Sequence, residues 1–358
     1  MTPGTSVRLG LIEGYYGRPW SWDARGETAA FLAAHGYHFY LYAPKADPYL
    51  RRRWREAHPA GEGDRIRRFA AHCADLGVDF GVGLSPFEIY RAFDAEAKAA
   101  LADKLTLLDE LGVRHLAILF DDMRGDLPAL AATQADILHW IGGRTRAERL
   151  IVCPTYYSDD PTLDQFFGVR PPRYLEDFGV ALDRAIDVFW TGPEVCSREL
   201  KPGHVARVAD QLRRKPLLWD NYPVNDGPRM SPYLHLRAFT GRSAEIAGLI
   251  AGHAVNPALQ PVLSRIPALT LAESYRLGED YDYAAAFARA AAVVLGPDLA
   301  DQVQSRLAAF QDVGLERLGD GVARLRARFA ETDHAAAREI VAWLDGAWTI
   351  TREEMEAS

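Results

Sequence analysis

Two consecutive aspartates, Asp121 and Asp122, come directly after the apolar run 115–120. The run is typical of a buried parallel strand, so both carboxylates are expected at its C-terminal tip, where neither has a packing role. Adjacent acids repel each other and their pKa values separate, so one can stay ionised while the other holds a proton near neutral pH. Such a pair suits acid–base catalysis. A Mg²⁺ site or the solvated start of a loop would show the same two residues, so the surrounding sequence has to decide.

The elements that would position this pair alternate between short apolar runs and amphipathic helical patterns. The apolar runs are 8–13, 38–43, 78–85, 115–120, 150–155, 188–191, 216–219 and 247–252. Between most of them lie helical patterns at 24–35, 62–76, 95–111, 128–143 and 203–213. Eight such repeats predict an α/β protein with a (β/α)8 TIM barrel. A doubly wound open sheet is the rival, but it would normally carry a glycine-rich phosphate turn after its first strand, where this chain has the bulky aromatic sequence 13–20.

The chain changes character from about residue 278, where alanine-rich, charged helical patterns replace the alternation of strands and helices. These patterns cover 282–294, 298–312, 318–331 and 333–345. We therefore expect a TIM-barrel catalytic domain over 1–277 and a small all-helical C-terminal domain over 278–358, which either packs on the barrel or forms the surface of a homodimer. The apolar stripe of Val303, Leu307 and Phe310 is interpreted as core and not as a ligand site.

Composition and charge exclude several classes of protein. The 358 residues are 48% hydrophobic and carry a formal net charge of −8; an acidic balance without a basic patch argues against nucleic acids and anionic membranes as partners. No apolar stretch approaches the ~20 residues that span a bilayer, and residues 1–6 leave no room for a signal peptide, so we expect a cytoplasmic protein. Cys73, Cys153 and Cys196 are too few and too scattered for a disulfide framework or a zinc site, and we expect neither a metal nor a cofactor.

In a TIM barrel the active site lies where the C-terminal ends of the strands meet. The predicted strand ends carry a lysine, asparagines, aspartates and a series of tyrosines and tryptophans. Stability alone does not require such a set. Sugars do, because their hydroxyls need dense hydrogen bonding and their C–H faces pack on aromatic rings. The strand ends therefore predict a carbohydrate site.

Six short motifs at these strand ends follow one another in the order of a known enzyme family. They are Glu-Gly-Tyr-Tyr-Gly-Arg-Pro-Trp at 13–20, Tyr-Leu-Tyr-Ala-Pro-Lys at 40–45, Phe-Asp-Asp-Met at 120–123, Cys-Pro-Thr-Tyr-Tyr at 153–157, Trp-Thr-Gly-Pro at 190–193 and Trp-Asp-Asn at 219–221. In this order the chain resembles glycoside hydrolase family 84, which contains the O-GlcNAcases and related β-N-acetylglucosaminidases. The resemblance covers roughly residues 8–260; each motif alone is weak, whereas the whole series is specific.

The resemblance implies a retaining exo-β-N-acetylglucosaminidase that acts on terminal β-linked N-acetylglucosamine of a glycoside or a glycoprotein. Such enzymes use no carboxylate nucleophile: the 2-acetamido oxygen of the substrate attacks C1 and forms an oxazoline, a departure from the usual two-carboxylate scheme. By resemblance, Asp121 accepts the acetamido N–H and stabilises the oxazolinium, and Asp122 is the general acid and base. Asp122 must then be protonated at rest, and we expect the charge of Asp121 to raise its pKa.

The resemblance also implies the residues around the sugar. Tyr157 matches the tyrosine that hydrogen-bonds the reacting acetamido oxygen, and Asn221 matches an asparagine that assists at the acetamido group. The positions that match contacts to sugar hydroxyls are Gly14 (through its backbone), Lys45, Asp226 and Asn256. The positions that match the small pocket for the acetyl methyl group are Cys153, Val195 and Trp219.

Two positions depart from the family pattern. Ala46 stands where family members often carry an aspartate, so the resemblance does not extend to the loop contact of that aspartate. Gly227 stands where an aromatic residue helps to cover the sugar in O-GlcNAcases. The leaving-group side is then either more open or covered by Tyr222, Tyr233 or a partner subunit.

Other interpretations stay open at this point. Lys45 would also suit the surface, Cys153 a buried core, Asn221 a turn, and Asn256 a cap before the proline that follows. For the whole chain, the alternative is a non-catalytic sugar-binding barrel, or a hexosaminidase of different glycan specificity without activity on O-GlcNAc proteins. A Mg²⁺-dependent phosphotransferase would need a phosphate-binding glycine loop and a third carboxylate, and the sequence shows neither at a convincing spacing.

Overall fold

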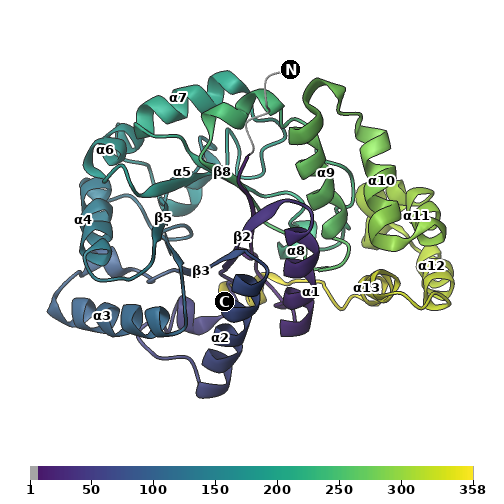
Figure 1. Ribbon diagram of the computed structural model, residues 1–358, viewed down its shortest axis with the longest axis horizontal. Coiled ribbons are helices and arrows are strands. Elements are labelled where there is room, and N and C mark those ends of the chain that lie inside the picture. The colour runs from purple at the N-terminus through teal and green to yellow at the C-terminus, as the bar shows by residue number, and fades with distance from the viewer. Residues whose placement is uncertain (1–6, 358) are drawn as a thin grey trace.

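Eight parallel strands close into one barrel, in chain order, in a computed structural model that describes residues 7–357. The strands are β1 Leu9–Ile12, β2 Tyr37–Tyr42, β3 Asp79–Leu84, β4 His115–Leu119, β5 Arg149–Cys153, β6 Asp187–Trp190, β7 Leu217–Asp220 and β8 Gly252–Val255. The ring closes where β8 pairs with β1, with His253 opposite Leu9. Helices surround the strands on the outside (Figure 1). The predicted (β/α)8 barrel is confirmed.

The eighth strand is the one that the sequence analysis placed wrongly. Residues Ala244–Leu249, which overlap the first half of the expected strand 247–252, form a 3₁₀ helix that Ser243 caps through its side chain. The strand itself begins at Gly252 and contains His253, a polar residue that hides the apolar pattern. The imidazole of His253 is fully buried against a carboxylate of β7, so its polarity does not mark an exposed position.

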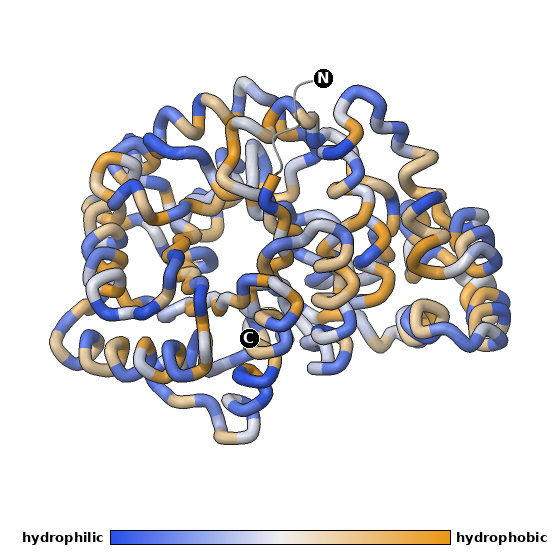
Figure 2. The backbone as a smooth tube through the Cα atoms, in the orientation of Figure 1, coloured by the Kyte–Doolittle hydropathy of each residue, from blue (hydrophilic) through white to orange (hydrophobic). Residues whose placement is uncertain are grey.

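Nine helices interleave with and follow the strands of the barrel within the described part of the chain. They are α1 Trp22–Ala33, α2 Ala60–Asp75, α3 Ala95–Glu110, α4 Leu130–Gly142, α5 Thr162–Phe167, α6 Tyr174–Ala181, α7 Pro202–Leu212, α8 Gly227–Met230 and α9 Arg265–Leu277. Hydrophilic and hydrophobic residues alternate along the helices (Figure 2), as expected where one face packs on the strands. The five helical patterns predicted between the strands correspond to α1–α4 and α7.

The strands are buried on both faces, which explains their nearly continuous apolar sequences. At one crowded point the ring of Phe39 lies where a side chain on Gly10 would be, since a Cβ there would come within 2.2 Å of the ring. Close packing of this kind holds the strand ends at defined positions, and the candidate site residues lie at those ends.

The C-terminal helices build a second apolar core beside the barrel. They are α10 Tyr283–Leu295, α11 Pro297–Gln304, α12 Gly321–Ala330 and α13 Ala335–Leu344, with a π-helical turn at Ala309–Val313. Val303 and Phe310 are fully buried and Leu307 is partly buried in this core, so the predicted core stripe is confirmed. Leu234 and Ile266 belong to the same core, so the helices pack on the segments around β8. The division at 277/278 stays a proposal.

The end of the chain returns to the barrel (Figure 1). Ile350 belongs to the barrel core, where it contacts the position of Gly17, and α14 Arg352–Ala357 lies against α8. Met355 packs on Gly227, so a residue of the chain's own C-terminal helix occupies the space beside the position where O-GlcNAcases carry an aromatic residue.

Within residues 7–357, every helix is too short or too polar to cross a membrane. Residues 1–6, on which the expectation about a signal peptide depends, lie outside the described part of the chain.

Candidate active site

The two consecutive aspartates lie at the C-terminal end of β4, and residues from β1 and β2 reach them. Lys45, which follows β2, is almost fully buried, and its Nζ donates to Asp121 Oδ2 at 2.5 Å and lies 3.2 Å from Asp122 Oδ2. The hydroxyl of Tyr16 donates to Asp122 Oδ2 at 2.6 Å. The barrel therefore gathers a cation, a phenol and two carboxylates, and the interpretation of Lys45 as a surface lysine is wrong.

The backbone turns sharply at the second aspartate. Asp122 has a φ of +57°, in the left-handed region that aspartate and asparagine tolerate better than most residues. Its side chain keeps about a quarter of its surface exposed, at 24%, whereas that of Asp121 keeps 7%. Asp122 is thus the more accessible acid of the pair.

One oxygen of Asp121 is buried without a hydrogen-bond partner among the residues that the structure describes. Oδ2 is held by Lys45, but Oδ1 accepts no hydrogen bond there. A buried carboxylate oxygen left in this state costs about 1–3 kcal/mol or more, so native proteins rarely keep one without a reason. The arrangement is suited to a ligand that brings an N–H or O–H donor.

The groups around the pair shift the two carboxyl pKa values in opposite directions, and the shift of Asp122 is opposite to the expectation. Burial raises the pKa of Asp121, and although Lys45 opposes this, repulsion from Asp122 adds to it. Burial also acts to raise the pKa of Asp122, but the ammonium of Lys45 and the hydroxyl of Tyr16 outweigh it and hold that pKa below its ordinary value. The expectation that Asp122 is the protonated acid at rest is therefore wrong for this arrangement, because two donors stabilise its charge.

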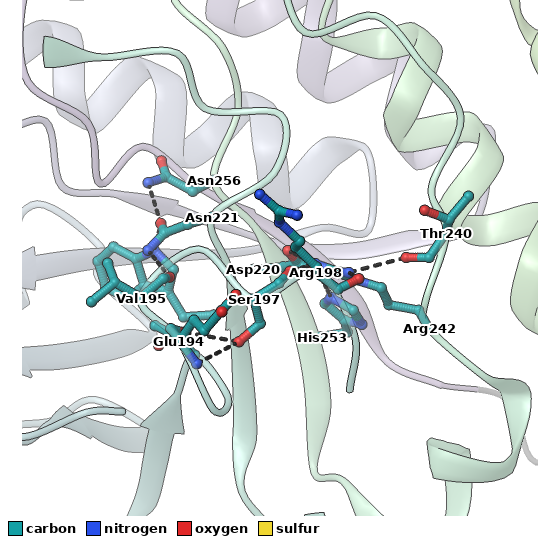
Figure 3. Close-up of polar contacts among 12 residues, drawn as sticks. Glu194, Val195, Ser197, Arg198, Asp220, Asn221, Thr240, Arg242, His253 and Asn256 are labelled. Atoms are coloured by element: carbon teal, nitrogen blue, oxygen red, sulfur yellow. Dashed lines mark hydrogen bonds and ion pairs between the residues drawn. The ribbon is translucent and has the colours of Figure 1, made fainter. Parts of the chain in front are cut away.

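A second group of polar residues joins the ends of β7, β8 and β1. Asn221 Oδ1 accepts from Trp219 Nε1 and from Asn256 Nδ2, both at 2.9 Å, and Asn221 Nδ2 donates to the carbonyl of Val195 at 2.9 Å (Figure 3). Asn256 Oδ1 accepts from the backbone N–H of Gly14 at 3.1 Å. Both asparagine amides therefore bridge strand ends, and the interpretations as a turn residue and a cap are wrong.

The loop after β1 needs a glycine where it meets β7. A Cβ on Gly14 would come within 2.0 Å of the indole of Trp219. The indole is buried and packs edge-on against Phe189, with ring centroids 5.1 Å apart. Gly14 therefore lets the backbone of the β1 loop lie directly against the indole.

Asp226 comes after β7 and is tied to the same β1 loop. Its Oδ2 accepts the backbone N–H of Tyr16 at 2.8 Å, and burial raises the pKa of Asp226 to about 6, with the charge of Asp122 adding to the effect. Tyr16 thus contacts one acid through its backbone and another through its hydroxyl. The sequence analysis assigned no role to Tyr16, although the conspicuous pair of tyrosines after the first strand was a signal that could have identified it.

Cys153 and Tyr157 line the same end of the barrel from β5. Both are buried, and burial raises the pKa of the thiol and of the phenol, so both stay neutral. The charges of Asp121 and Asp122 raise both pKa values further, which places the two side chains within electrostatic reach of the acids. The interpretation of Cys153 as buried is correct, and its position is also at the site.

The loop after β6 is held close to this group. The backbone N–H of Val195 donates to Asp160 Oδ2 at 3.1 Å, while its carbonyl accepts from Asn221. Asp160 is a second residue that the sequence analysis missed, since nothing in the local pattern relates it to a residue 35 positions away. In the described part of the chain no group of three or more His, Cys, Asp and Glu side chains is arranged to hold a metal ion.

A strand-end site with paired acids, amides and aromatic rings on a TIM barrel can be compared with known proteins. The model of the beta-N-acetylglucosaminidase family matches residues 9–312. The chain belongs to that family. The resemblance to glycoside hydrolase family 84 is thereby confirmed.

Similar proteins are found among curated sequences and solved structures. The chain is 29% identical over 279 residues to the Protein O-GlcNAcases of Rattus norvegicus and Mus musculus, a match that covers 75% of this chain but only 30% of each relative. A mutant of the Thermobaculum terrenum O-GlcNAc hydrolase is 30% identical with a TM-score of 0.78, covering 95% of this chain and 81% of that one. CpGH84B is 25% identical with a TM-score of 0.77, covering 95% and 66%.

Proposed function

We propose that the protein is a retaining exo-β-N-acetylglucosaminidase of the O-GlcNAcase type, which removes terminal β-linked N-acetylglucosamine through an oxazoline intermediate. The observation that carries the proposal is Asp121 Oδ1, a buried oxygen without a described partner that lies beside a more exposed acid. An acetamido N–H supplies the donor that this oxygen lacks. Membership of the family and similarity to O-GlcNAc hydrolases support the same activity.

In the first step, Asp121 accepts the acetamido N–H and aims the acetamido oxygen at C1. The C1–oxygen bond to the aglycone breaks as the acetamido oxygen bonds to C1, and Asp122 gives its proton to the departing oxygen. In the second step, Asp122 takes a proton from water, the water oxygen bonds to C1, and the oxazoline C1–oxygen bond breaks. Two displacements at C1 return the β-configuration.

Substrate binding would also move the proton to the acid that needs it. An N–H donor on Asp121 Oδ1 stabilises the ionised form of Asp121, which otherwise has a raised pKa. The fuller negative charge on Asp121 then raises the pKa of Asp122, because the two groups repel. The acetamido group would thus be oriented by one acid and would prepare its neighbour for proton donation.

The remaining site residues would bind the sugar. Tyr157 would donate to the acetamido oxygen, and Asn221 would assist there with an N–H of its amide, one of which already donates to Val195. The backbone N–H of Gly14 is occupied by Asn256, so its carbonyl is the group that would accept from a sugar hydroxyl. Three further residues would bind sugar hydroxyls: Lys45, Asp226 and Asn256. The acetyl methyl group would lie among Cys153, Val195 and Trp219.

The experiment that tests the nucleophile measures kcat/KM on 4-nitrophenyl glycosides that carry N-acetyl, N-fluoroacetyl, N-difluoroacetyl and N-trifluoroacetyl groups. Because fluorine draws electrons from the attacking oxygen, the rate should fall steadily and by orders of magnitude, whereas a steric clash would give one late drop. The matched control is the glucoside without a 2-acetamido group, which should not be cleaved. A flat response, or the α-anomer as the first product by NMR, contradicts the proposal.

Assays with and without chelator, and on several substrates, distinguish the proposed glycosidase from a phosphotransferase and from a sugar-binding barrel. Activity should persist with chelator, because the attacking oxygen belongs to the substrate and the proton comes from Asp122; activity that vanishes and returns with Mg²⁺ would favour phosphotransferase-like chemistry. Binding of N-acetylglucosamine without turnover would indicate a sugar-binding barrel. Comparison of kcat/KM on an O-GlcNAc protein and on chitobiose tests the glycoprotein substrate. Cytoplasmic location and a homodimer remain proposals, to be checked by fractionation and by light scattering.

A further inference from the structure

Arg242 uses every N–H of its guanidinium to join two parts of the barrel end. The residue is 8% exposed. Nε and Nη2 donate to the two oxygens of Asp220 at 2.7 and 2.6 Å, and Nη2 also donates to the carbonyl of Ser197 at 2.8 Å. Nη1 donates to the carbonyls of Arg198 and Thr240 at 2.8 and 3.0 Å (Figure 3). Five donors are thus matched by five acceptors, which is the full capacity of an arginine.

The carboxylate that holds Arg242 belongs to the residue between two candidate site residues. Asp220 lies between Trp219 and Asn221, and successive side chains of a strand point to opposite sides. Trp219 and Asn221 contact each other on one side, while Asp220 meets the guanidinium on the other. A shift of Asp220 would therefore be transmitted through one strand to both neighbours.

Asp220 is ionised and firmly held. His253 Nε2 lies 3.0 Å from Asp220 Oδ2, and the hydroxyl of Tyr275 lies 2.8 Å from His253 Nδ1. Burial acts to raise the pKa of Asp220, but Arg242 and His253 outweigh it and lower the pKa to about 2. The charge that anchors the guanidinium is therefore present at all physiological pH values.

The loop that Arg242 holds is the one that carries Val195. The carbonyls of Ser197 and Arg198 lie two and three residues after Val195, and the Ser197 hydroxyl donates to the carbonyl of Glu194 at 2.8 Å. The carbonyl of Val195 then accepts from Asn221, the residue next to Asp220. The contacts form a ring from Asp220 through Arg242 and the loop back to β7.

We propose that Arg242 is a positioning residue that sets the width of the acyl pocket between Val195 and β7, and so restricts the substrate to an N-acetyl group. The inference rests on the proposed function. It extends that function, because the hydrogen bonds of Arg242 go to the carboxylate of Asp220 and to backbone carbonyls, and not to Asp121 or Asp122. A lysine has three donors on one nitrogen and cannot span the same acceptors, so Arg242→Lys should release the loop.

The test compares kcat/KM on 4-nitrophenyl glycosides with N-acetyl, N-propanoyl and N-butanoyl groups. The unsubstituted protein should discriminate strongly, because a pocket that rejects one methylene is worth roughly 10-fold or more. In Arg242→Lys the ratio of N-acetyl to N-butanoyl activity should fall by about tenfold. We expect kcat/KM to fall for the N-acetyl substrate and to fall less, or not at all, for the N-propanoyl and N-butanoyl substrates.

Arg214 offers a matched control at the opposite end of the barrel, just before β7. Its guanidinium likewise donates to five acceptors, the carbonyls of Gly179, Leu182, Asp183, Ile186 and Leu212. Arg214→Lys should lower the melting temperature to a similar degree but leave the acyl ratio unchanged. A role of Arg242 in stability alone predicts an unchanged acyl ratio in both variants, which would overturn the inference, as would an equal change of the ratio in both.

A second variant covers the case in which Arg242→Lys does not fold. Gly241 has a φ of +70°, and a Cβ there would come within 2.3 Å of the carbonyl oxygen of Arg198, so Gly241→Ala presses on the same loop and keeps the guanidinium. The acyl ratio should again fall, and an unchanged ratio in this active variant would overturn the inference. Failure of the proposed function looks different, because the unsubstituted protein would then not hydrolyse the N-acetyl substrate.

Discussion

Asp121 and Asp220 are both buried aspartates at strand ends of the same barrel, yet their surroundings differ. Both oxygens of Asp220 are held by Arg242 and His253, and the pKa is lowered to about 2. Asp121 has one oxygen on Lys45 and one without a described partner, and its pKa is raised. Burial is common to both, so burial does not mark a functional acid. The proposed role of Asp121 rests instead on its unfilled hydrogen-bonding capacity, because buried polar groups in native proteins are rarely left without a partner.

A large effect that is the same on every substrate is expected from Asp121→Ala. Loss of the group that orients the acetamido oxygen and stabilises the oxazolinium should lower kcat/KM by roughly 10²–10³ or more. The loss should be nearly the same on nitrophenyl and alkyl glycosides, because Asp121 does not act on the leaving group. Measurement on a series of leaving groups checks this, and a steep dependence would mean that the roles of the two acids are exchanged.

Asp122→Ala should fail in a way that depends on the leaving group. Without a proton donor, alkyl glycosides should lose roughly 10²–10⁴ in rate, whereas nitrophenyl glycosides, whose leaving oxygen needs little help, should retain much more activity. The same leaving-group series gives the result. A uniform loss over the series would contradict the assignment of Asp122 as the general acid.

Asp220→Asn should mainly lower the stability of the fold, whereas substitutions of Asp121 should mainly lower activity. It leaves the charge of Arg242 buried and uncompensated, which should cost about 3–5 kcal/mol in the free energy of unfolding. Asp121→Asn should cost much less, because Lys45 keeps Asp122 as a partner. Chemical denaturation of both variants at neutral pH makes the comparison. Equal destabilisation would remove the distinction between a saturated and an unsaturated carboxylate.

A third buried carboxylate, Glu339 of α13, sharpens the comparison with Asp220. Its oxygens accept the backbone N–H groups of Val262 and Leu263 at 2.9 and 3.0 Å, but burial still raises its pKa to about 7. Since the folded pKa is above the ordinary value, its contribution to stability is complete below about pH 4.5 and is lost as the pH rises through about 7, by about 3 kcal/mol at most.

Melting temperatures of the protein and of Glu339→Gln between about pH 4 and about pH 8 measure this effect. The slope of stability against pH should be flatter in the variant, which cannot lose a proton, although the variant as a whole is less stable because an amide accepts through one oxygen. Parallel slopes would mean that Glu339 does not titrate in this range.

The smallest effect is expected from Tyr16→Phe. The Tyr16 hydroxyl stabilises the charge of Asp122, so its removal should raise the pKa of Asp122 and move the basic limb of the kcat/KM profile to higher pH. The rate at neutral pH should change by less than about tenfold. Tyr15→Phe is the control, because that hydroxyl donates to Glu13 and not to Asp122. A shift of the basic limb to lower pH would contradict the conclusion that the Tyr16 hydroxyl stabilises the ionised form of Asp122.

Local patterns predicted most of the fold, and the family resemblance supplied the candidate site residues. Apolar runs bounded by turn residues located seven of the strands, because both faces of a barrel strand are buried. The eighth strand was missed because it contains the polar residue His253, which can be buried only because its imidazole contacts Asp220. Tyr16 and Asp160 were missed because their partners lie 106 and 35 positions away, and no periodicity records such contacts.

The amino-acid sequence by itself determined the barrel and the placement of Asp121 and Asp122 at its mouth, since the order of strands dictates which ends converge. The candidate residues around the two acids came from the family resemblance. The tertiary structure alone decided the direction in which the pKa of each acid moves, because these pKa values depend on a lysine that follows β2 and, for Asp122, on a tyrosine that follows β1. It also decided which aspartate is a structural anchor, since Asp220 differs from Asp121 only in what the folded chain brings to its oxygens.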